Sequence, residues 1–250
     1  MICLSVVSHG QAPIAAGFLS SLASVKPPLV TRVVYTRNIP EPALAIPDLD
    51  PIRFEIIDNA APHGFGENHN AAFRRCAEPY FCVVNPDILL VEDPFPALVD
   101  AFREPALGLA APLVLSPERQ VENTARSLYT PAELLRQKWR PRNRAGSADW
   151  LAGMFMLFRS DVYRLIGGFD ERFFLYIEDV DICTRLRVAG FGLRQQAGAQ
   201  VIHAAQKRSH RSLRHAAWHT RSMLRYWATP SFWRYRSMLK QARRMPASPG

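Results

Sequence analysis

Three carboxylates fall within four residues of one another in the later part of the chain, at Glu178, Asp179 and Asp181. Carboxylates this close repel one another, so the arrangement is costly unless a cation or hydrogen-bonded partners offset the repulsion. On helical spacing Glu178 and Asp181 share one side while Asp179 points elsewhere, so one carboxylate can face a pocket while the others brace the turn. The spacing therefore indicates that a purely structural role for all three carboxylates is costly.

A solvated helix start is the alternative interpretation of the same acids, because the helix dipole favours acidic residues in the first turn. It accounts best for Asp181. It does not explain why aromatic residues stand so close to the carboxylates, at Phe173, Phe174 and Tyr176.

Two shorter motifs precede this segment. Asn85-Pro86-Asp87 ends an apolar stretch typical of a buried strand, and open α/β sheets bind ligands at the carboxyl ends of their strands. A carboxylate there can hold a hard divalent cation against a diphosphate, although the tripeptide is also a good turn. Gly64-Phe65-Gly66 leads into a helix, whose amino terminus favours phosphate or polar sugar groups. Its spacing matches neither the dinucleotide nor the P-loop motif, so a plain turn stays open as the alternative.

Strand and helix patterns alternate along the chain, which predicts an α/β fold with a mostly parallel central sheet flanked by helices. Residues 124–147 form a polar, Arg-rich connection. The expected strands cover residues 2–8, 32–36, 54–58, 80–85, 107–115, 154–158 and 199–203, and the expected helices cover residues 14–22, 67–75, 94–102, 160–166 and 179–189.

Charge divides the chain into two parts. All 22 Asp and Glu lie at or before Asp181, whereas 14 of the 31 Lys and Arg follow it, so residues 1–181 carry a formal charge of −5 and the remainder +14. No apolar run reaches the eighteen or so residues that span a bilayer, and the amino terminus lacks a signal-peptide pattern. We therefore expect a cytoplasmic protein. The four cysteines form no CxxC pair, which predicts reduced thiols.

Taken together, these segments resemble the family 2 nucleotide-sugar glycosyltransferases with the GT-A fold, particularly the rhamnosyltransferase-like branch. The resemblance spans roughly residues 1–205. It rests on three segments in the family's order: GFGENHNAAF at 64–73, VVNPD at 83–87 and WLAGMFMLFRSDVYRLIGGFDERFFLYIEDVDICTRLRVAGF at 150–191.

The resemblance implies an inverting sugar transfer that depends on Mg²⁺ or Mn²⁺. Asp87 takes the position of the family's metal ligand, and His203 matches a histidine that can complete the metal shell, although a histidine at a strand end is as often a packing residue. Asp179 matches the proposed general base, with Glu178 and Asp181 positioning it and the acceptor. The residues expected to bind the nucleotide-diphosphate sugar are Ser8, Asn38, Gly64, Phe65, Gly66, Asn70, Asn85 and Asp87.

The acceptor side is assigned by the same resemblance. Trp150 and Gly153 stand where the family lines its acceptor pocket, with Trp150 as a plain core residue the alternative, and Arg185 would neutralise part of the local negative charge. One position departs from the family, because Arg37 stands where an acid that grips the nucleotide base is expected, and an arginine cannot accept hydrogen bonds. Asp58 and Asn59 are candidates to substitute for it.

The sequence predicts two parts, a GT-A domain at 1–205 and a basic, amphipathic helical extension at 206–250. One helical face of the extension contains Leu213, Ala216, Ala217, Met223, Leu224 and Trp227. Such a helix suits an anionic membrane surface at the inner face of the cell membrane, where a polyprenyl-diphosphate-linked acceptor resides; an ordinary packing helix is the alternative. No nucleic-acid module is recognisable, so nucleic acid is not an expected partner.

Two functions follow from these patterns. The first is an inverting glycosyltransferase that moves a sugar, with rhamnose suggested by the branch, from a nucleotide-diphosphate donor to a glycan or lipid-linked acceptor in surface polysaccharide biosynthesis. The second is a non-catalytic relative that binds a nucleotide or glycan as an interaction subunit, a reading motivated by Arg37.

Overall fold

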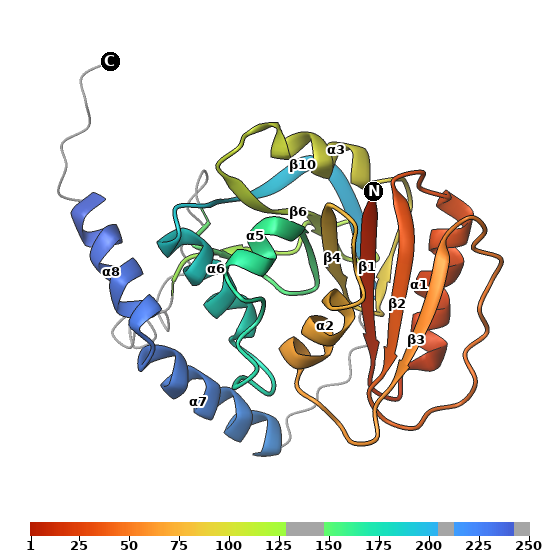
Figure 1. The fold of residues 1–250 in the computed structure, drawn as a ribbon, viewed down its shortest axis with the longest axis horizontal. Coiled ribbons are helices and arrows are strands. Elements are labelled where there is room, and N and C mark those ends of the chain that lie inside the picture. The colour runs from red at the N-terminus through yellow and green to blue at the C-terminus, as the bar shows by residue number, and fades with distance from the viewer. Residues whose placement is uncertain (129–147, 205–212, 243–250) are drawn as a thin grey trace.

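A computed structural model describes residues 1–128, 148–204 and 213–242, and its central feature is an eight-stranded sheet (Figure 1). The strand order across the sheet is β3-β2-β1-β4-β9-β6-β10-β5. These strands are β1 (Ile2–Ser8), β2 (Val30–Arg37), β3 (Arg53–Asp58), β4 (Tyr80–Val84), β5 (Ile88–Leu89), β6 (Leu107–Leu115), β9 (Phe155–Arg159) and β10 (Gly192–His203).

Most strand pairs in this sheet are parallel, as the alternation of strand and helix patterns predicts. β1 pairs in parallel with both β2 and β4, β2 with β3, and β6 with β10. β9 lies antiparallel between β4 and β6, and β5 pairs antiparallel with the end of β10. The predicted strand at 199–203 begins seven residues earlier, at Gly192, because its first half is polar and only partly buried and so lacks the apolar run of a central strand.

Helices cover both faces of the sheet and divide the core into two clusters. One cluster lies under α1 (Ala12–Val25) and α3 (Phe95–Asp100), which continues into the 3₁₀ turn η1 (Ala101–Arg103). The other lies under α2 (Phe65–Phe73), α5 (Ser160–Leu165) and α6 (Glu178–Val188). Alternate residues of β1 point to opposite faces, so Leu4 belongs to the first cluster and Cys3 to the second.

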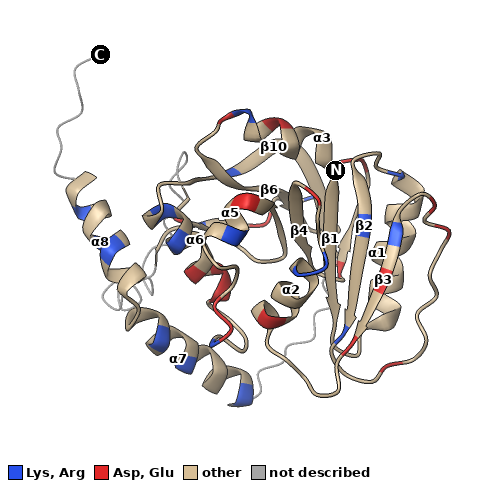
Figure 2. Ribbon diagram, in the orientation of Figure 1, with Lys and Arg blue, Asp and Glu red and all other residues tan. Residues whose placement is uncertain are grey.

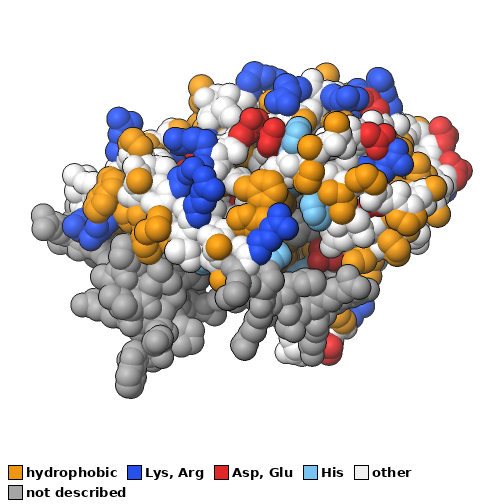
Figure 3. Space-filling model, turned by 90° about the horizontal axis from the view of Figure 1, so that it is seen from below, with side chains coloured by type: hydrophobic (Ala, Val, Ile, Leu, Met, Phe, Trp, Pro, Cys, Tyr) orange, Lys and Arg blue, Asp and Glu red, His pale blue; other side chains and the backbone are white. Residues whose placement is uncertain are grey.

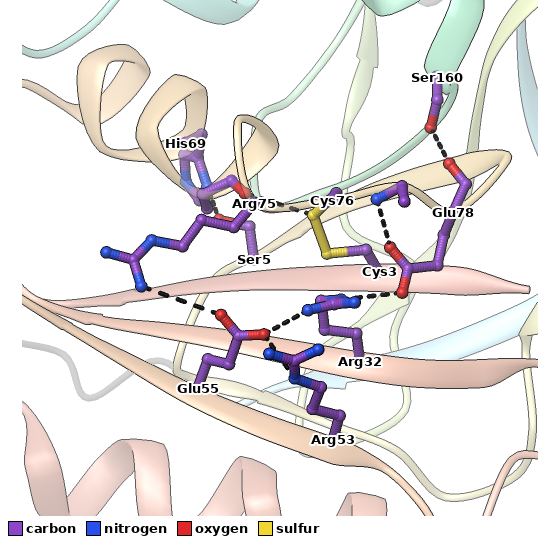
Figure 4. The surroundings of a disulfide bond; sticks show 12 residues. Cys3, Ser5, Arg32, Arg53, Glu55, His69, Arg75, Cys76, Glu78 and Ser160 are labelled. Carbon is purple, nitrogen blue, oxygen red and sulfur yellow. Dashed lines mark hydrogen bonds and ion pairs between the residues drawn. A yellow bond between two sulfur atoms is a disulfide. The ribbon is translucent and has the colours of Figure 1, made fainter.

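Cys3 of β1 and Cys76, just after α2, form a disulfide (Figure 4). The prediction of reduced thiols is therefore wrong for these two residues. The reason is tertiary: α2 packs on the face of β1 from which Cys3 projects, so residues 73 positions apart in the sequence have Cα atoms 6.1 Å apart. Cys82 and Cys183 are free and buried, and burial raises the pKa of both thiols.

The described part of the basic extension forms two helices, α7 (Leu213–Trp227) and α8 (Pro230–Ala242), which lie on the side of the molecule opposite β3 (Figure 1). Their buried residues include Met223, Tyr226 and Phe232, which join the second core cluster. The predicted apolar face was only partly right: Leu224 is 60% exposed, whereas Tyr226 is fully buried and exchanges a hydrogen bond of 2.6 Å with Thr184 of α6.

Some sequence predictions concern residues outside the described ranges. The predicted domain boundary at 205/206 lies there, as do residues 129–147 of the connection predicted at 124–147. Within the described residues, none of the helices is both long and apolar enough to cross a membrane.

Gly66 is required by the packing of α2 against the loop at 168–175. A Cβ atom added there would lie 2.5 Å from Cβ of Phe169. We therefore expect Gly66→Ala to lower the free energy of unfolding by about 1–3 kcal/mol, the usual cost of an overpacked core. Thermal melting of the purified protein measures this.

Gly17→Ala is the matched control, because a Cβ in that helix would make an ordinary contact of 3.6 Å with Leu89. The control should melt at or above the wild-type temperature, since alanine favours a helix interior over glycine. A Gly66→Ala protein as stable as Gly17→Ala would contradict the packing role.

Candidate active site

The carboxyl ends of β1, β2 and β3 meet in a network of polar side chains. Asn38, just after β2, accepts hydrogen bonds on Oδ1 from the Asn59 side chain (2.9 Å) and the His63 amide (2.8 Å). Its Nδ2 donates to the His63 carbonyl at 2.9 Å. Asn59 also donates to Asn68 of α2 at 2.6 Å. The network fixes the ends of these strands against the start of α2.

Glu41 supplies a carboxylate to this sheet edge that the sequence reasoning missed. It accepts hydrogen bonds from the Ser8 hydroxyl (2.5 Å) and the Tyr35 hydroxyl (2.7 Å). Glu41 lies in the irregular segment after β2, where no periodicity marks a residue as functional. Ser8 and Asn38, both expected to bind the donor, are thus brought to one edge, together with an acid.

Arg37 pairs with Asp58, the residue directly beside it on β3. The guanidinium Nη2 donates to Oδ2 of Asp58 at 2.8 Å, and this hydrogen bond to Arg37 holds the pKa of Asp58 below its usual range. Both side chains are exposed in part, so the pair contributes little to stability. Asp58 is therefore engaged by Arg37.

The glycine motif and Asn70 contact the loop that precedes α6. Phe65 N–H donates to the Phe174 carbonyl at 2.9 Å, and a Cβ at Gly64 would lie 2.9 Å from the same carbonyl oxygen. Asn70 is buried, donates to the Phe169 carbonyl (2.9 Å) and accepts from the Phe169 amide (3.0 Å). The close approach expected of these glycines is to the protein's own loop, and their donor-binding role stays a prediction.

Asp87 and His203 meet at the ends of β4 and β10. His203 Nε2 lies 3.2 Å from Oδ2 of Asp87, and its Nδ1 lies 3.0 Å from Oε2 of Glu122. The hydrogen bond to Asp87 raises the pKa of His203 most, Glu122 adds to it, and burial opposes both, giving about 8. Glu122 is a further residue that the sequence reasoning missed, because it lies in a loop 81 residues from His203.

This pair fits a hard divalent cation. Oδ1 of Asp87 is buried and has no hydrogen-bond partner among the described residues. A buried carboxylate oxygen without a donor is costly, and a cation would satisfy it. Imidazole and carboxylate are ligands for Mn²⁺ and related ions, and a carboxylate on the far ring nitrogen orients a metal-binding histidine.

Asp179, in the first turn of α6, is held by backbone amides. Its Oδ2 accepts from the Gly153 N–H at 3.1 Å and its Oδ1 from the Val180 N–H at 2.8 Å. A Cβ at Gly153 would lie 3.3 Å from Cβ of Asp179, so glycine permits this approach. Burial raises the pKa of Asp179 above the ordinary value, and the amide hydrogen bonds oppose that shift.

The turn at residues 153 and 154 connects Asp179 with the segment that contains Asn85 and Asp87. Residues 153 and 154 lie between β8 (Trp150–Leu151), which pairs with β7 (Ala125–Arg126), and β9. Gly153 binds Asp179, and the Met154 carbonyl accepts from the Asn85 amide at 2.9 Å. Asn85 lies two residues before Asp87. The predicted base and the predicted metal ligand are therefore positioned by consecutive residues.

Glu178 is buried beside Asp179. Burial and the negative charge of Asp179 raise the pKa of Glu178. Its Oε2 has no hydrogen-bond partner among the described residues, which disfavours the ionised form further. Each carboxyl disfavours the ionised form of the other, and because two amides donate to Asp179, Asp179 is the better stabilised of the two as an anion.

Asp181 and Arg185 form a buried ion pair. Arg185 Nε lies 2.7 Å from Oδ2 of Asp181, and its Nη1 donates to the Ile166 carbonyl at 2.7 Å. The pair ties α6 to the end of α5. Asp181 is therefore paired with Arg185, and the predicted roles of Asp181 and Arg185 toward the acceptor stay predictions.

Trp150 is buried, and its indole N–H donates to the Ser127 carbonyl at 3.0 Å. The guanidinium of Arg126 lies 5.3 Å from the centre of its ring. Arg126 also lowers the pKa of Asp179 slightly against the larger effect of burial. The burial and the backbone hydrogen bond of Trp150 agree with the alternative that it is a core residue. Arg126 lies near the carboxylates, and its place in the sequence gave no sign of this.

The backbone bends sharply just before Glu178. Tyr176 and Ile177 both have φ of 71°, in the left-handed region that β-branched Ile177 rarely adopts. The Tyr176 hydroxyl lies 2.7 Å from Nδ1 of His215 on α7. The segment that delivers Glu178 and Asp179 is therefore strained and held from outside by α7.

Comparison with known proteins identifies the family and the fold. Residues 45–224 match the family described as glycosyltransferase like family 2. The N-acetylglucosaminyl-diphospho-decaprenol L-rhamnosyltransferase of Mycobacterium tuberculosis is 32% identical over 157 residues, which cover 55% of this chain and 51% of that protein, so the chain spans about half its length. Rhamnosyltransferase WbbL of Escherichia coli K12 is 27% identical over 187 residues, covering 66% of this chain and 70% of WbbL.

Among solved structures, the mannosyltransferase PcManGT of Pyrobaculum calidifontis in complex with GDP-Man and Mn²⁺ superposes with a TM-score of 0.61 at 14% identity. The superposition covers 99% of this chain and 76% of that one. A likeness at this identity concerns the fold, and it agrees with the sheet described above. The chain belongs to the glycosyltransferase like family 2 and has the GT-A fold that its sequence predicts.

Proposed function

We propose that this chain is an inverting, metal-dependent glycosyltransferase that moves a hexose from a nucleotide-diphosphate donor to a glycan or polyprenyl-diphosphate-linked acceptor. The observation that carries the proposal is the turn at 153–154, which places a partly exposed carboxylate, Asp179, next to the segment of Asn85 and Asp87. The two rhamnosyltransferase relatives make rhamnose the first sugar to test and surface polysaccharide biosynthesis the process to examine.

Asp87 and His203 are the residues that would hold Mg²⁺ or Mn²⁺. The ion, when bound, would stabilise the negative charge on the departing nucleoside diphosphate. Glu122 orients the His203 ring so that Nε2 faces Asp87. Because a histidine must be neutral to bind a metal, binding of the ion would displace the proton that Asp87 and Glu122 otherwise favour on His203.

Asp179 is the residue that would act as the general base. It takes the proton of the acceptor hydroxyl as that oxygen forms a bond to the anomeric carbon, while the bond from this carbon to the diphosphate oxygen breaks on the opposite side. A single displacement of this kind inverts the anomeric configuration. The Gly153 and Val180 amides orient the carboxylate and favour its ionised form against the effect of burial.

Ser8, Asn38 and Glu41 form the edge at which the nucleotide would bind. Glu41 supplies an acceptor of hydrogen bonds where the family's usual acid is replaced by Arg37, which pairs with Asp58. The replacement at residue 37 therefore leaves a carboxylate at this edge. The comparisons lend no support to the non-catalytic alternative that Arg37 suggested.

The first prediction concerns the donor site. Nucleoside diphosphates and their sugars should raise the melting temperature of the wild type only when Mn²⁺ or Mg²⁺ is present, because ligands that bind the folded state alone stabilise it. Asp87→Ala should lose this metal-dependent shift. Asp100→Ala, which removes an exposed carboxylate on α3, is the control and should keep it. A shift that survives in Asp87→Ala would place the metal elsewhere.

The second prediction concerns transfer itself. Asp179→Asn keeps the shape of the side chain and removes its basicity, so turnover should fall by at least about a hundredfold, the usual contribution of a general base. The variant should retain the wild-type melting behaviour and nucleotide binding. The configuration of the product, determined by NMR, should be opposite to that of the donor; a retained configuration would exclude single displacement.

The third prediction concerns pH. The base must be ionised, and burial raises the pKa of Asp179, so kcat/KM should fall with decreasing pH at a higher pH than the ordinary Asp value of about 4 would give. Glu178→Gln mimics the protonated form of Glu178, so in this variant kcat/KM should fall at nearly the same pH as in the wild type. A fall close to pH 4 in the wild type, or a Glu178→Gln variant as inactive as Asp179→Asn, would contradict this division of roles.

A further inference from the structure

An arginine-lined cavity of about 310 Å³ lies between α7 and the loop that precedes α6. Four of its lining residues are arginines and none is acidic; the lining consists of Arg172, Phe174, Arg214, Trp218, Arg221, Ser222 and Arg225. Figure 2 shows the basic positions along α7, and in Figure 3, seen from below, basic side chains lie beside hydrophobic ones. The cavity thus combines positive charge with apolar surface.

Positive charge in this cavity is only partly neutralised by the protein. Arg172 pairs with Asp170, at 2.5 Å between Nη2 and Oδ2, and Arg225 donates to the Arg172 carbonyl. Arg214 and Arg221 have no carboxylate partner among the described residues, and no acidic residue follows Asp181 anywhere in the chain. Guanidinium groups gathered in this way bind phosphate oxygens well, because their planar donors match phosphate geometry.

One wall of the cavity is aromatic. The rings of Phe174 and Trp218 lie 5.2 Å apart, and the guanidinium of Arg214 lies 4.6 Å from the centre of the Trp218 ring. Stacking on Trp218 holds Arg214 in place and leaves its N–H groups free for an anion. A ligand that suits this surface has a phosphate or diphosphate joined to an apolar chain.

The cavity is built on the same segment of chain as the two active-site carboxylates. Phe174 lies on its wall, and its carbonyl accepts from Phe65 at the start of α2. Ser222 of α7 donates to the Leu175 carbonyl at 3.0 Å. Three residues after Leu175 the chain reaches Glu178, through the strained turn at Tyr176 and Ile177. A ligand in the cavity therefore contacts the loop that delivers Glu178 and Asp179.

We propose that this cavity binds the diphosphate of a lipid-linked acceptor, with Arg214 and Arg221 as its ligands and Trp218 against the first part of the apolar chain. The inference rests on the proposed sugar transfer, because it assigns the acceptor of that reaction. It differs from the donor site, since the donor's diphosphate belongs at Asp87 and His203 and needs the metal. The acceptor's diphosphate is bound here by arginine without a metal.

A binding measurement tests the cavity independently of catalysis. Farnesyl diphosphate is titrated by calorimetry in EDTA into the Asp87→Ala protein, in which the metal-dependent donor site cannot compete. We expect binding that falls at least about tenfold when Arg214→Ala and Arg221→Ala are added, because each removes charge-assisted hydrogen bonds. Equal affinity with and without the two arginines would overturn the proposal.

The matched control removes two arginines from α8. Arg234→Ala and Arg236→Ala take away the same charge, and Arg236 stacks on Trp233 at 5.1 Å much as Arg214 stacks on Trp218. This control should bind farnesyl diphosphate like its parent. An equal loss of affinity in the Arg214/Arg221 variant and the Arg234/Arg236 variant would show a general effect of positive charge and would overturn the proposed site.

Kinetics then connect the cavity to the acceptor. The ratio of kcat/KM for a lipid-diphosphate sugar to that for the same sugar on an uncharged alkyl chain should fall about tenfold in the Arg214/Arg221 variant and stay constant in the Arg234/Arg236 variant. An unchanged ratio in both, with lost binding to phosphatidylglycerol vesicles, would make the cavity a membrane headgroup site and refute the proposal. Absence of transfer by the wild type would instead refute the proposed function, while the calorimetry still decides the site.

Discussion

The side-chain amide of Asn70 is the interaction on which the site depends. This side chain is buried in α2. It donates a hydrogen bond to the Phe169 carbonyl and accepts hydrogen bonds from the Phe169 amide and, at 2.7 Å, from the Tyr163 hydroxyl. A Cβ at Gly168 would lie 2.4 Å from its oxygen, so the loop at 168–175 can dock only in this form. A buried amide that lost these partners would be costly, which makes the loop's position close to all-or-none. That position sets where α6 begins and hence where Glu178 and Asp179 lie.

The buried carboxylates around this loop differ in what surrounds them. Oδ1 of Asp87 is buried without a hydrogen-bond partner among the described residues, burial and the charge of Asp179 raise the pKa of Glu178, and Asp181 is paired with Arg185. The arginines of α7 stand apart from these acids across the loop. The positive charge of α7 is therefore not cancelled by the carboxylates at the start of α6.

Prediction from sequence succeeded where the signal is local and periodic. Apolar runs such as those of β1 and β4 identified the parallel sheet, and the ordered motifs identified the family and its GT-A fold. It failed where contacts join distant loops. Glu41, Glu122 and Arg126 lie in irregular or short segments without a pattern, and the Cys3–Cys76 disulfide joins residues whose spacing carries no signal. On α7, Tyr226 replaced Leu224 as the buried residue because α6 offers its hydroxyl a partner in Thr184.

By itself, the sequence determined the fold class and the family, since hydrophobic periodicity and residue type are properties of the chain before it folds. Only the tertiary structure decided what each polar group faces. It brought Asn70, Gly64 and Gly66 against the loop at 168–175, paired Asp181 with Arg185, and left Oδ1 of Asp87 without a hydrogen-bond partner among the described residues. The physical reason is that burial and hydrogen-bond partners come from residues far apart in the sequence, so the shift of a side chain's pKa from its ordinary value depends on the packed structure.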